Sequence, residues 1–102
     1  MSQPVYSDPI ALAQPIKRGQ TEVKEITLRR PGSGELRGLK LADLVQGDVT
    51  SVIRLLPRIS QPTLVDQEAA AMDVYDLTNC ADQIAIFLQT PPQKPAAEAS
   101  PE

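Results

Sequence analysis

ELRGLKLADLVQGDVTSVIRLLPRIS, residues 35–60, is the stretch of sequence that decides the fold. It is rich in leucine and valine and contains neither histidine nor cysteine. Its second half has apolar residues at steps of three and four, which predicts an amphipathic helix with a face of Val49, Val52, Ile53, Leu56 and Ile59. Asp48 is the expected N-cap, and Pro57 should bend or end the helix because proline has no N–H to donate. The stretch predicts an apolar helical surface, with no sign of a reaction centre.

Shorter helical segments flank this helix. Before it, Ser33 can cap a piece that Gly38 interrupts and Gly47 ends, with an apolar face of Leu36, Leu39, Leu41, Leu44 and Val45. After it, Thr63 with Asp66 and Asp73 with Asp76 have the spacing of capping boxes, so a short helix at about 64–70 should precede a longer one at about 74–89. The longer helix has a face of Leu77, Cys80, Ala81, Ile84, Phe87 and Leu88.

Residues 9–17 and 21–29 predict a β-hairpin. Apolar residues alternate in the first strand, and Gly19 supplies a turn. In the second strand Ile26 and Leu28 share a face, but Val23 is out of phase, which indicates a bulge near Lys24 and Glu25. Pro15 favours an edge position for the first strand because proline cannot donate to a β-ladder.

The order of these segments predicts an α+β fold: an N-terminal β-hairpin followed by three or four short α-helices. A chain of 102 residues is expected to form one domain, here residues 9–89. Residues 1–8 lack any period and should be a flexible N-terminus. Residues 90–102 should be a disordered tail of proline, alanine and acidic residues, because such a composition buries too little apolar surface.

Little in the composition supports catalysis. There is no histidine, which removes the commonest general base and metal ligand. Cys80, the single cysteine, lies on a predicted apolar helix face and should be a buried hydrophobe. Residues 30–34, RPGSG, match neither of the phosphate-binding loop patterns GxxxxGK[ST] and GxGxxG, and they favour a turn. No enzyme activity, cofactor or metal is therefore expected, and the absence of a signal peptide, membrane span or cysteine pair favours a reduced, cytoplasmic setting.

Charge is distributed unevenly along the chain. Residues 1–60 have nine Lys or Arg and six Asp or Glu, whereas residues 61–102 have one lysine and seven acids. Such polarity allows copies to associate head to tail. The basic half also permits a small DNA-binding regulator, but interleaved acids and the lack of an aromatic platform disfavour nucleic acid as a partner.

The layout resembles that of the small tail assembly chaperones of Mu-like and related contractile-tailed phages and prophages. The resemblance covers roughly residues 9–88 and rests on an ordered combination of segments: the hairpin, Ile26–Pro31, Gly34–Leu39, Asp43–Leu44, Asp48, Leu55–Ser60 and the later acid-capped helix.

This resemblance implies a non-enzymatic assembly factor in the host bacterial cytoplasm. Such proteins bind and shield the phage tape measure protein during tail morphogenesis, in many copies, and are often also made as a frameshift-extended form. A structural tail or baseplate subunit of the virion is the alternative.

The expected contact with such a client is an apolar groove. Its predicted partner-binding residues are Leu55, Leu56, Ile59, Leu77, Ile84 and Phe87. The competing interpretation is that all six close one ordinary hydrophobic core.

Overall fold

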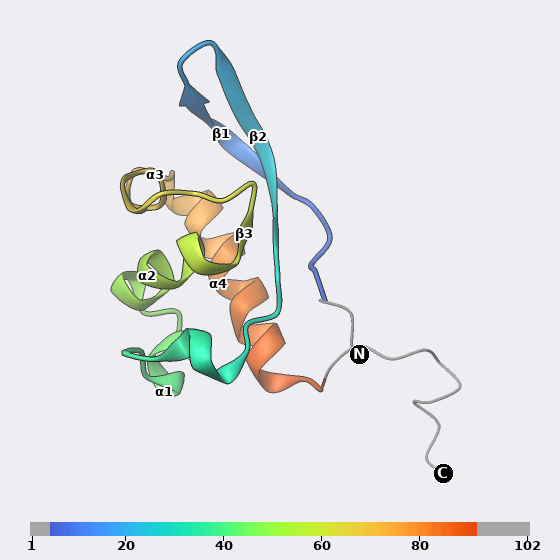
Figure 1. Cartoon of the computed structure of the whole chain (residues 1–102), viewed down its shortest axis with the longest axis vertical. Helices are drawn as coiled ribbons and strands as arrows, with labels where there is room; N and C mark the ends of the chain where they lie inside the picture. Colours follow the sequence, from blue (N-terminus) through green and yellow to red (C-terminus); the bar gives the residue numbers. More distant parts are fainter. Residues whose placement is uncertain (1–4, 92–102) are drawn as a thin grey trace, which may run out of the picture.

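A β-hairpin stands over a layer of helices (Figure 1). The structure is a computed structural model that describes residues 5–91. The elements, in chain order, are β1 (Ile10–Arg18), β2 (Thr21–Leu28), η1, a 3₁₀ helix (Ser33–Leu36), α1 (Leu41–Val45), α2 (Val49–Ile59), β3 (Ser60–Gln61), α3 (Asp66–Ala70) and α4 (Val74–Gln89). The predicted α+β fold, with an N-terminal hairpin and then several helices, is confirmed.

The sheet has the order β1-β2-β3 and is antiparallel throughout. Thr27 and Leu28 of β2 pair with Gln61 and Ser60 of β3, so β2 is central and β1 is an edge strand, as Pro15 indicated. Ile10 pairs with Ile26 and Ile16 with Val23, so β1 has the extra residues between these pairs. The irregularity therefore lies opposite the predicted bulge at Lys24 and Glu25, but on the other strand.

The irregular part of β1 is held by a buried carboxylate. Asp76, 1% exposed in the first turn of α4, accepts hydrogen bonds from the backbone N–H groups of Ala13 at 2.7 Å and Gln14 at 3.1 Å. Since the bulge takes these N–H groups out of the β-ladder, they need another acceptor. Asp76 thus fixes the hairpin to α4 and does not take the capping-box role that its spacing predicted.

The helix starts confirm some capping predictions and correct others. Asp48 accepts from the backbone of Ser51 at 3.0 Å, and Asp73 accepts from that of Tyr75 at 2.9 Å, so both are N-caps. Ser33 is not a cap, because Gly32 precedes η1 and donates to Glu35. The predicted capping box of Thr63 and Asp66 is also wrong: α3 begins at Asp66, and Glu68 accepts from the N–H of Val65.

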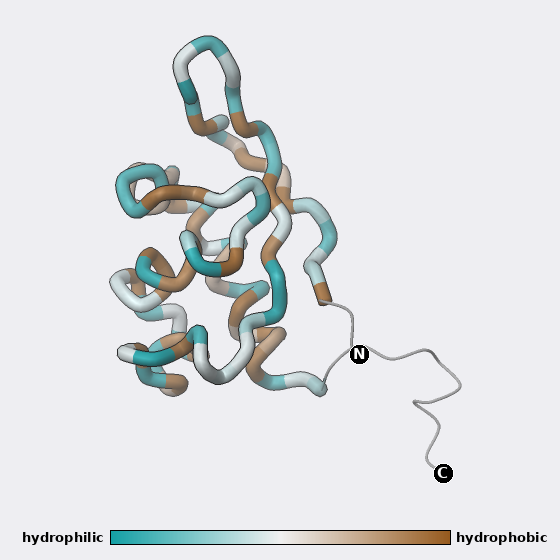
Figure 2. The backbone as a smooth tube through the Cα atoms, viewed as in Figure 1, coloured by the Kyte–Doolittle hydropathy of each residue, from teal (hydrophilic) through white to brown (hydrophobic). Residues whose placement is uncertain are grey.

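Aliphatic side chains from the hairpin and the helices form one core. Its buried members are Leu12, Val23, Ile26, Leu28, Leu44, Val52, Leu55, Leu56, Ile59, Leu64, Ala69, Cys80, Ile84 and Phe87. Hydrophobic segments gather where the helices face the base of the hairpin, while its tip is mostly polar (Figure 2). Pro57 lies inside α2, which continues to Ile59.

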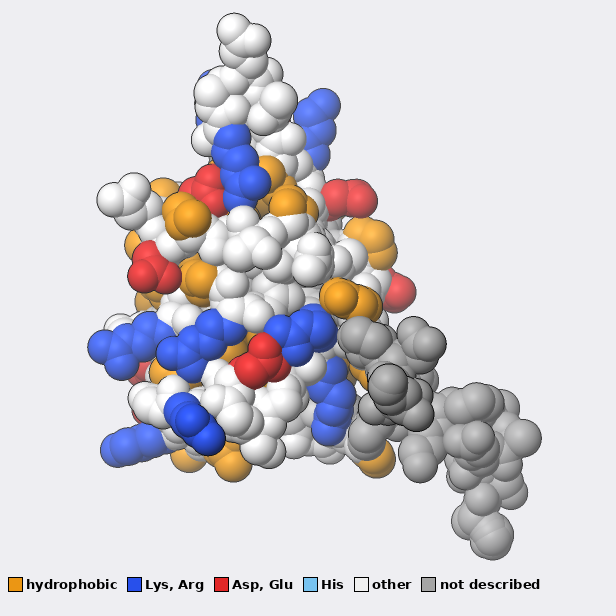
Figure 3. All heavy atoms as spheres, viewed as in Figure 1, with side chains coloured by type: hydrophobic (Ala, Val, Ile, Leu, Met, Phe, Trp, Pro, Cys, Tyr) orange, Lys and Arg blue, Asp and Glu red, His pale blue; other side chains and the backbone are white. Residues whose placement is uncertain are grey.

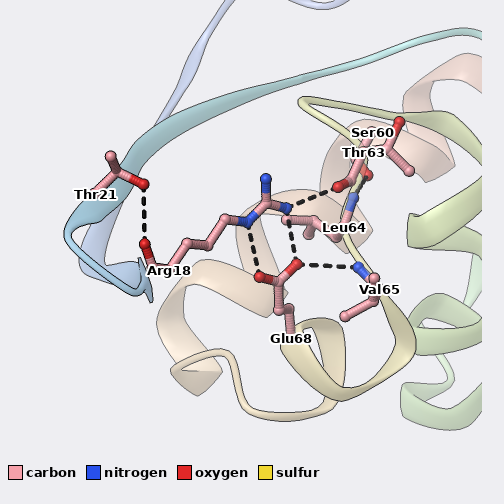
Figure 4. Close-up of polar contacts among 7 residues, drawn as sticks. All are labelled: Arg18, Thr21, Ser60, Thr63, Leu64, Val65 and Glu68. Carbon is pink, nitrogen blue, oxygen red and sulfur yellow. Dashed lines mark hydrogen bonds and ion pairs between the residues drawn. The ribbon is translucent and has the colours of Figure 1, made fainter.

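An ion pair ties the end of β1 to α3 (Figure 4). Arg18 donates through Nε and Nη2 to the two carboxylate oxygens of Glu68, each at 2.8 Å, and through Nη2 to the carbonyl of Thr63 at 2.7 Å. These hydrogen bonds lower the pKa of Glu68, and the N–H of Val65 adds to the effect. The contact brings residues about fifty positions apart together and supports the hairpin from below.

Arginines also fasten the turn after β2. Arg29 makes a bidentate contact with Glu35, one of whose bonds is 2.7 Å, and Arg58 of α2 donates to the carbonyl of Glu35. The hydrogen bonds from Arg29 lower the pKa of Glu35 to about 2. Arg30 donates to the carbonyls of Phe87 and Thr90, two acceptors at the end of α4. Residues 29–35 are thereby fixed to both long helices.

The chain before β1 runs beside the end of β2. The N–H of Arg30 donates to the carbonyl of Val5, and the N–H of Ser7 donates to that of Leu28, both at 2.7 Å. Residues 5–7 of the predicted flexible segment 1–8 are therefore hydrogen-bonded to the sheet. Residues 1–4 and 92–102, which include most of the predicted disordered tail, lie outside the described residues.

Candidate functional site

The six predicted partner-binding residues lie where α2 packs against α4 and its neighbours. Leu55, Leu56 and Ile84 have no exposed surface, and Ile59 and Phe87 are also buried. Leu77 is partly buried and packs against the same core. We call the five buried residues the core seam. Their part in partner binding stays a prediction, and in this conformation the seam is closed.

Where α2 and α4 begin, their contact opens into a hollow. It has a volume of about 210 Å³ and is lined by Gln46, Gly47, Val49, Val52, Val74, Leu77, Thr78, Ala81 and Asp82. Its apolar members, Val49, Val52, Val74, Leu77 and Ala81, define what we call the α2–α4 groove. Leu77 is the one predicted site residue that the structure places in it. The groove is small and can accept one or two apolar side chains of a partner.

The rim of the groove consists of two valines in equivalent positions. Val49 follows the N-cap Asp48 and Val74 follows the N-cap Asp73, so each is the first residue of its helix. Val49 is 55% exposed and Val74 is 72% exposed. The exposure belongs to these two side chains and not to the whole first turn, since Asp76, two residues after Val74, is buried against β1. The sequence hinted at both through its repeated Asp-Val pair, but helical periodicity assigned Val49 to the buried face.

Gly47 closes one side of the α2–α4 groove. Its φ of 77° is the left-handed conformation that ends α1, as predicted for this glycine. A Cβ atom placed at Gly47 would lie 3.9 Å from the Cβ of Ala81, so the turn sits directly against α4. Beyond the turn, Leu41 and Val45 of α1 are also exposed, and hydrophobic side chains reach the surface along the lower edge of the molecule in Figure 3. The apolar surface therefore extends past the groove.

The chemistry of the described side chains suits packing better than catalysis. Burial raises the pKa of the Cys80 thiol to about 12, and the charge of Asp76 adds to the effect, so this cysteine is a poor nucleophile. Within residues 5–91, no group of three or more His, Cys, Asp or Glu side chains could hold a metal ion. In the same range, no helix has the length and apolar character needed to cross a membrane.

Comparison with known proteins shows the family of the chain. The family model described as "Phage tail assembly chaperone proteins, E, or 41 or 14" matches residues 9–89. The chain belongs to this family of phage tail assembly chaperones. The resemblance seen in the order of its segments is thereby confirmed.

Two proteins of Escherichia phage P2 are similar to this family member. Tail assembly protein E is 39% identical over 79 residues, which are 78% of this chain and 87% of that protein. Tail assembly protein E′ is 39% identical over 79 residues, again 78% of this chain but only 56% of the relative. E′ therefore has a longer remainder outside the aligned part than E has. No solved structure gives a significant match to the chain.

Proposed function

We propose that this family member is a non-enzymatic chaperone that binds and shields the tape measure protein while the phage tail is built. One observation carries the proposal: a tail assembly chaperone presents two solvent-exposed valines, Val49 and Val74, at the rim of an apolar groove. Exposed apolar groups that flank a hollow are the means by which a protein covers apolar surface on another molecule.

The size of the groove favours transient binding. A hollow of about 210 Å³ admits few side chains, so a single contact should be weak. Many copies along one long helical client would keep its apolar surface out of water, and each could be displaced by a tighter binder such as a tail subunit. This work would take place in the host cytoplasm, before the tail is complete.

We further propose that this fold is also made in an extended form by a translational frameshift. The support is the pair of P2 relatives, since both match over 79 residues at 39% identity and differ in the length that remains. The nucleotide sequence of the gene tests the idea. A slippery codon run upstream of the stop codon supports the extended form, and its absence removes that support.

Co-expression with the phage's tape measure protein tests the client. The soluble fraction of the tape measure protein should rise with the wild-type chain and fall back with Val49→Ser combined with Val74→Ser. Val65→Ser is the matched control, because Val65 is 56% exposed but lies outside the groove. If the tape measure protein stays equally soluble with the double variant, the groove is not the binding site. If the wild-type chain gives no gain, the client is wrong.

Mass spectrometry of purified virions separates a chaperone from a structural subunit. A chaperone leaves before the tail is finished, so its peptides should be absent from mature particles. Peptides present in a fixed ratio to the tube or baseplate proteins would show a permanent component instead.

A further inference from the structure

A second hollow lies on the other flank of α2. It has a volume of about 650 Å³ and is lined by Gly38, Leu39, Thr50, Ile53, Arg54, Pro57, Arg58, Asp66 and Ala70. We call it the α2–α3 groove. Its floor is apolar, from Leu39, Ile53 and Pro57, each of which is half-buried. Pro57 has no N–H, so it cannot make the usual helical hydrogen bond to the carbonyl of Ile53.

The surroundings of the α2–α3 groove are basic. Residues 29–58 have six Lys or Arg against three acids, and one of those acids, Glu35, is paired with Arg29. Figure 3 shows Lys and Arg side chains gathered in the lower half of the molecule, with little acidic surface between them. Arg54 is exposed and makes no ion pair with any residue in the described range 5–91. Arg54 and Arg58 line the groove together with one acid, Asp66, so the lining is apolar with a net positive charge and is complementary to an apolar surface that has an acidic group.

The outer face of α4 has the complementary character. Tyr75, Asp82 and Ile86 are seven and four residues apart and share one side of the helix. Tyr75 is 61% exposed, Ile86 is 53% exposed and Asp82 is exposed as well. Residues 61–91 contain five acids and no basic residue, so this face lies in an acidic field. We call these three residues the α4 stripe.

We propose that the α2–α3 groove of one copy binds the α4 stripe of a second copy. Asp82 would face Arg54, and the ring of Tyr75 would cover the apolar floor. Complementary charges supply both the attraction and the orientation. The inference goes beyond the proposed function, because it requires no client.

The two surfaces generate an open assembly. They share no residue and lie on different elements, so the contact is head to tail and each bound copy leaves one groove and one stripe free. Such heterologous contacts continue into a row unless the rotation closes a ring. Since Asp82 also lines the α2–α4 groove, each neighbouring copy would lie beside that groove, and a row of copies would repeat the groove at regular intervals.

Sedimentation velocity of the purified chain at increasing concentration tests this contact. Wild-type protein should associate progressively at low salt and less at 0.5 M salt, where charges are screened over about 3–5 Å. Arg54→Glu and Asp82→Arg should each weaken association about tenfold or more, because like charges would then face each other. Lys24→Glu and Glu22→Arg, which make the same charge changes on the exposed hairpin, are the matched controls.

Mixing the two groove and stripe variants gives the sharper result. The Asp82→Arg protein has an intact groove and the Arg54→Glu protein an intact stripe, so association should return when they are combined. Circular dichroism confirms that each variant is folded. A wild-type chain that stays monomeric at low salt, variants that associate like the wild type, or a mixture that fails to associate would each overturn the inference. These outcomes leave the client proposal intact, since that proposal rests on Val49 and Val74. Because Asp82 also lines the α2–α4 groove, client binding is tested with the valine variants and not with Asp82→Arg.

Discussion

The core seam and the α2–α4 groove are built mainly from the same two helices and the same class of side chain, yet they differ in exposure. Leu55, Leu56 and Ile84 of the seam are fully buried, whereas Val49 and Val74 at the groove are more than half exposed. The difference arises from what covers each side chain. The seam residues pack into the core under the hairpin and the other helices, whereas Val49 and Val74 stand beside the hollow where α2 and α4 begin. Asp76, in the same first turn of α4 as Val74, is covered by β1.

This contrast teaches that apolar periodicity alone does not identify a binding surface. A leucine on a helical face most often closes the core, and in this chain the seam does so. The exposed apolar side chains beside the hollow are Val49 and Val74, and we propose that they bind the partner. Changes to the seam should therefore act on folding, and changes to the groove on binding.

The largest expected effect is on the seam. Leu56→Ala should lower the free energy of unfolding by about 2–5 kcal/mol, because it leaves a cavity in a closed core. Urea denaturation followed by circular dichroism measures it. A loss below about 1 kcal/mol would show that the seam is not closed in solution.

A smaller loss of stability is expected when the buried carboxylate of Asp76 is removed. Asp76→Ala would leave the N–H groups of Ala13 and Gln14 without their acceptor, at a cost of about 2 kcal/mol. Amide hydrogen exchange should also become faster in the hairpin than in α2. Asp82→Ala, on the exposed side of α4, is the control and should change neither. Equal stability of the Asp76 variant would mean that the hairpin does not depend on this anchor.

Low pH should weaken the ion pair of Arg29 and Glu35 and leave the core seam and the α2–α4 groove unchanged. The pKa of Glu35 is about 2 when folded, below its ordinary value of 4.5. Its contribution to stability is therefore complete above about pH 4.5 and is lost as the pH falls toward 2. Glu35→Gln should remove this part of the pH dependence, while costing at most about 1 kcal/mol at neutral pH because the carboxylate is a third exposed. Denaturation of both proteins across that pH range measures this difference. If the stability of the wild type and of the Glu35→Gln variant depends on pH in the same way, the contact is absent.

The smallest effect on stability belongs to the groove. Val74→Ser removes an exposed side chain and should change the free energy of unfolding by no more than about 0.5 kcal/mol. Urea denaturation beside the wild type checks this. A loss comparable to that of Leu56→Ala would mean that Val74 belongs to the core and that the contrast between the two regions fails.

Much of the fold was predictable because local signals agreed with one another. The helix expected at about 74–89 is α4, since a clear apolar period, the N-cap Asp73 and the prolines after Thr90 all indicated the same limits. The phase break between Val23 and Ile26 correctly indicated an irregular hairpin. It could not reveal that β1 held the extra residues, because either strand can absorb a change of phase.

Long-range contacts escaped prediction for a physical reason. Asp76 binds backbone groups more than sixty residues away, and capping-box spacing offered it a nearer role. The open groove was missed because periodicity predicts which residues share the apolar side of a helix. It does not predict which of these residues the neighbouring elements leave exposed. The six predicted residues all lie on α2 and α4, and Leu77 is the one among them that lines the α2–α4 groove; their part in partner binding stays a prediction.

Methyl-resolved NMR of the chain with a soluble fragment of the tape measure protein can distinguish binding at the groove from opening of the core. We expect shifts in the methyl signals of Val49, Val74 and Leu77, while those of Leu55, Leu56 and Ile84 keep their positions and line widths. Seam signals that move or broaden as much as the groove signals would contradict this expectation, since they would show that the protein opens its core to hold the client.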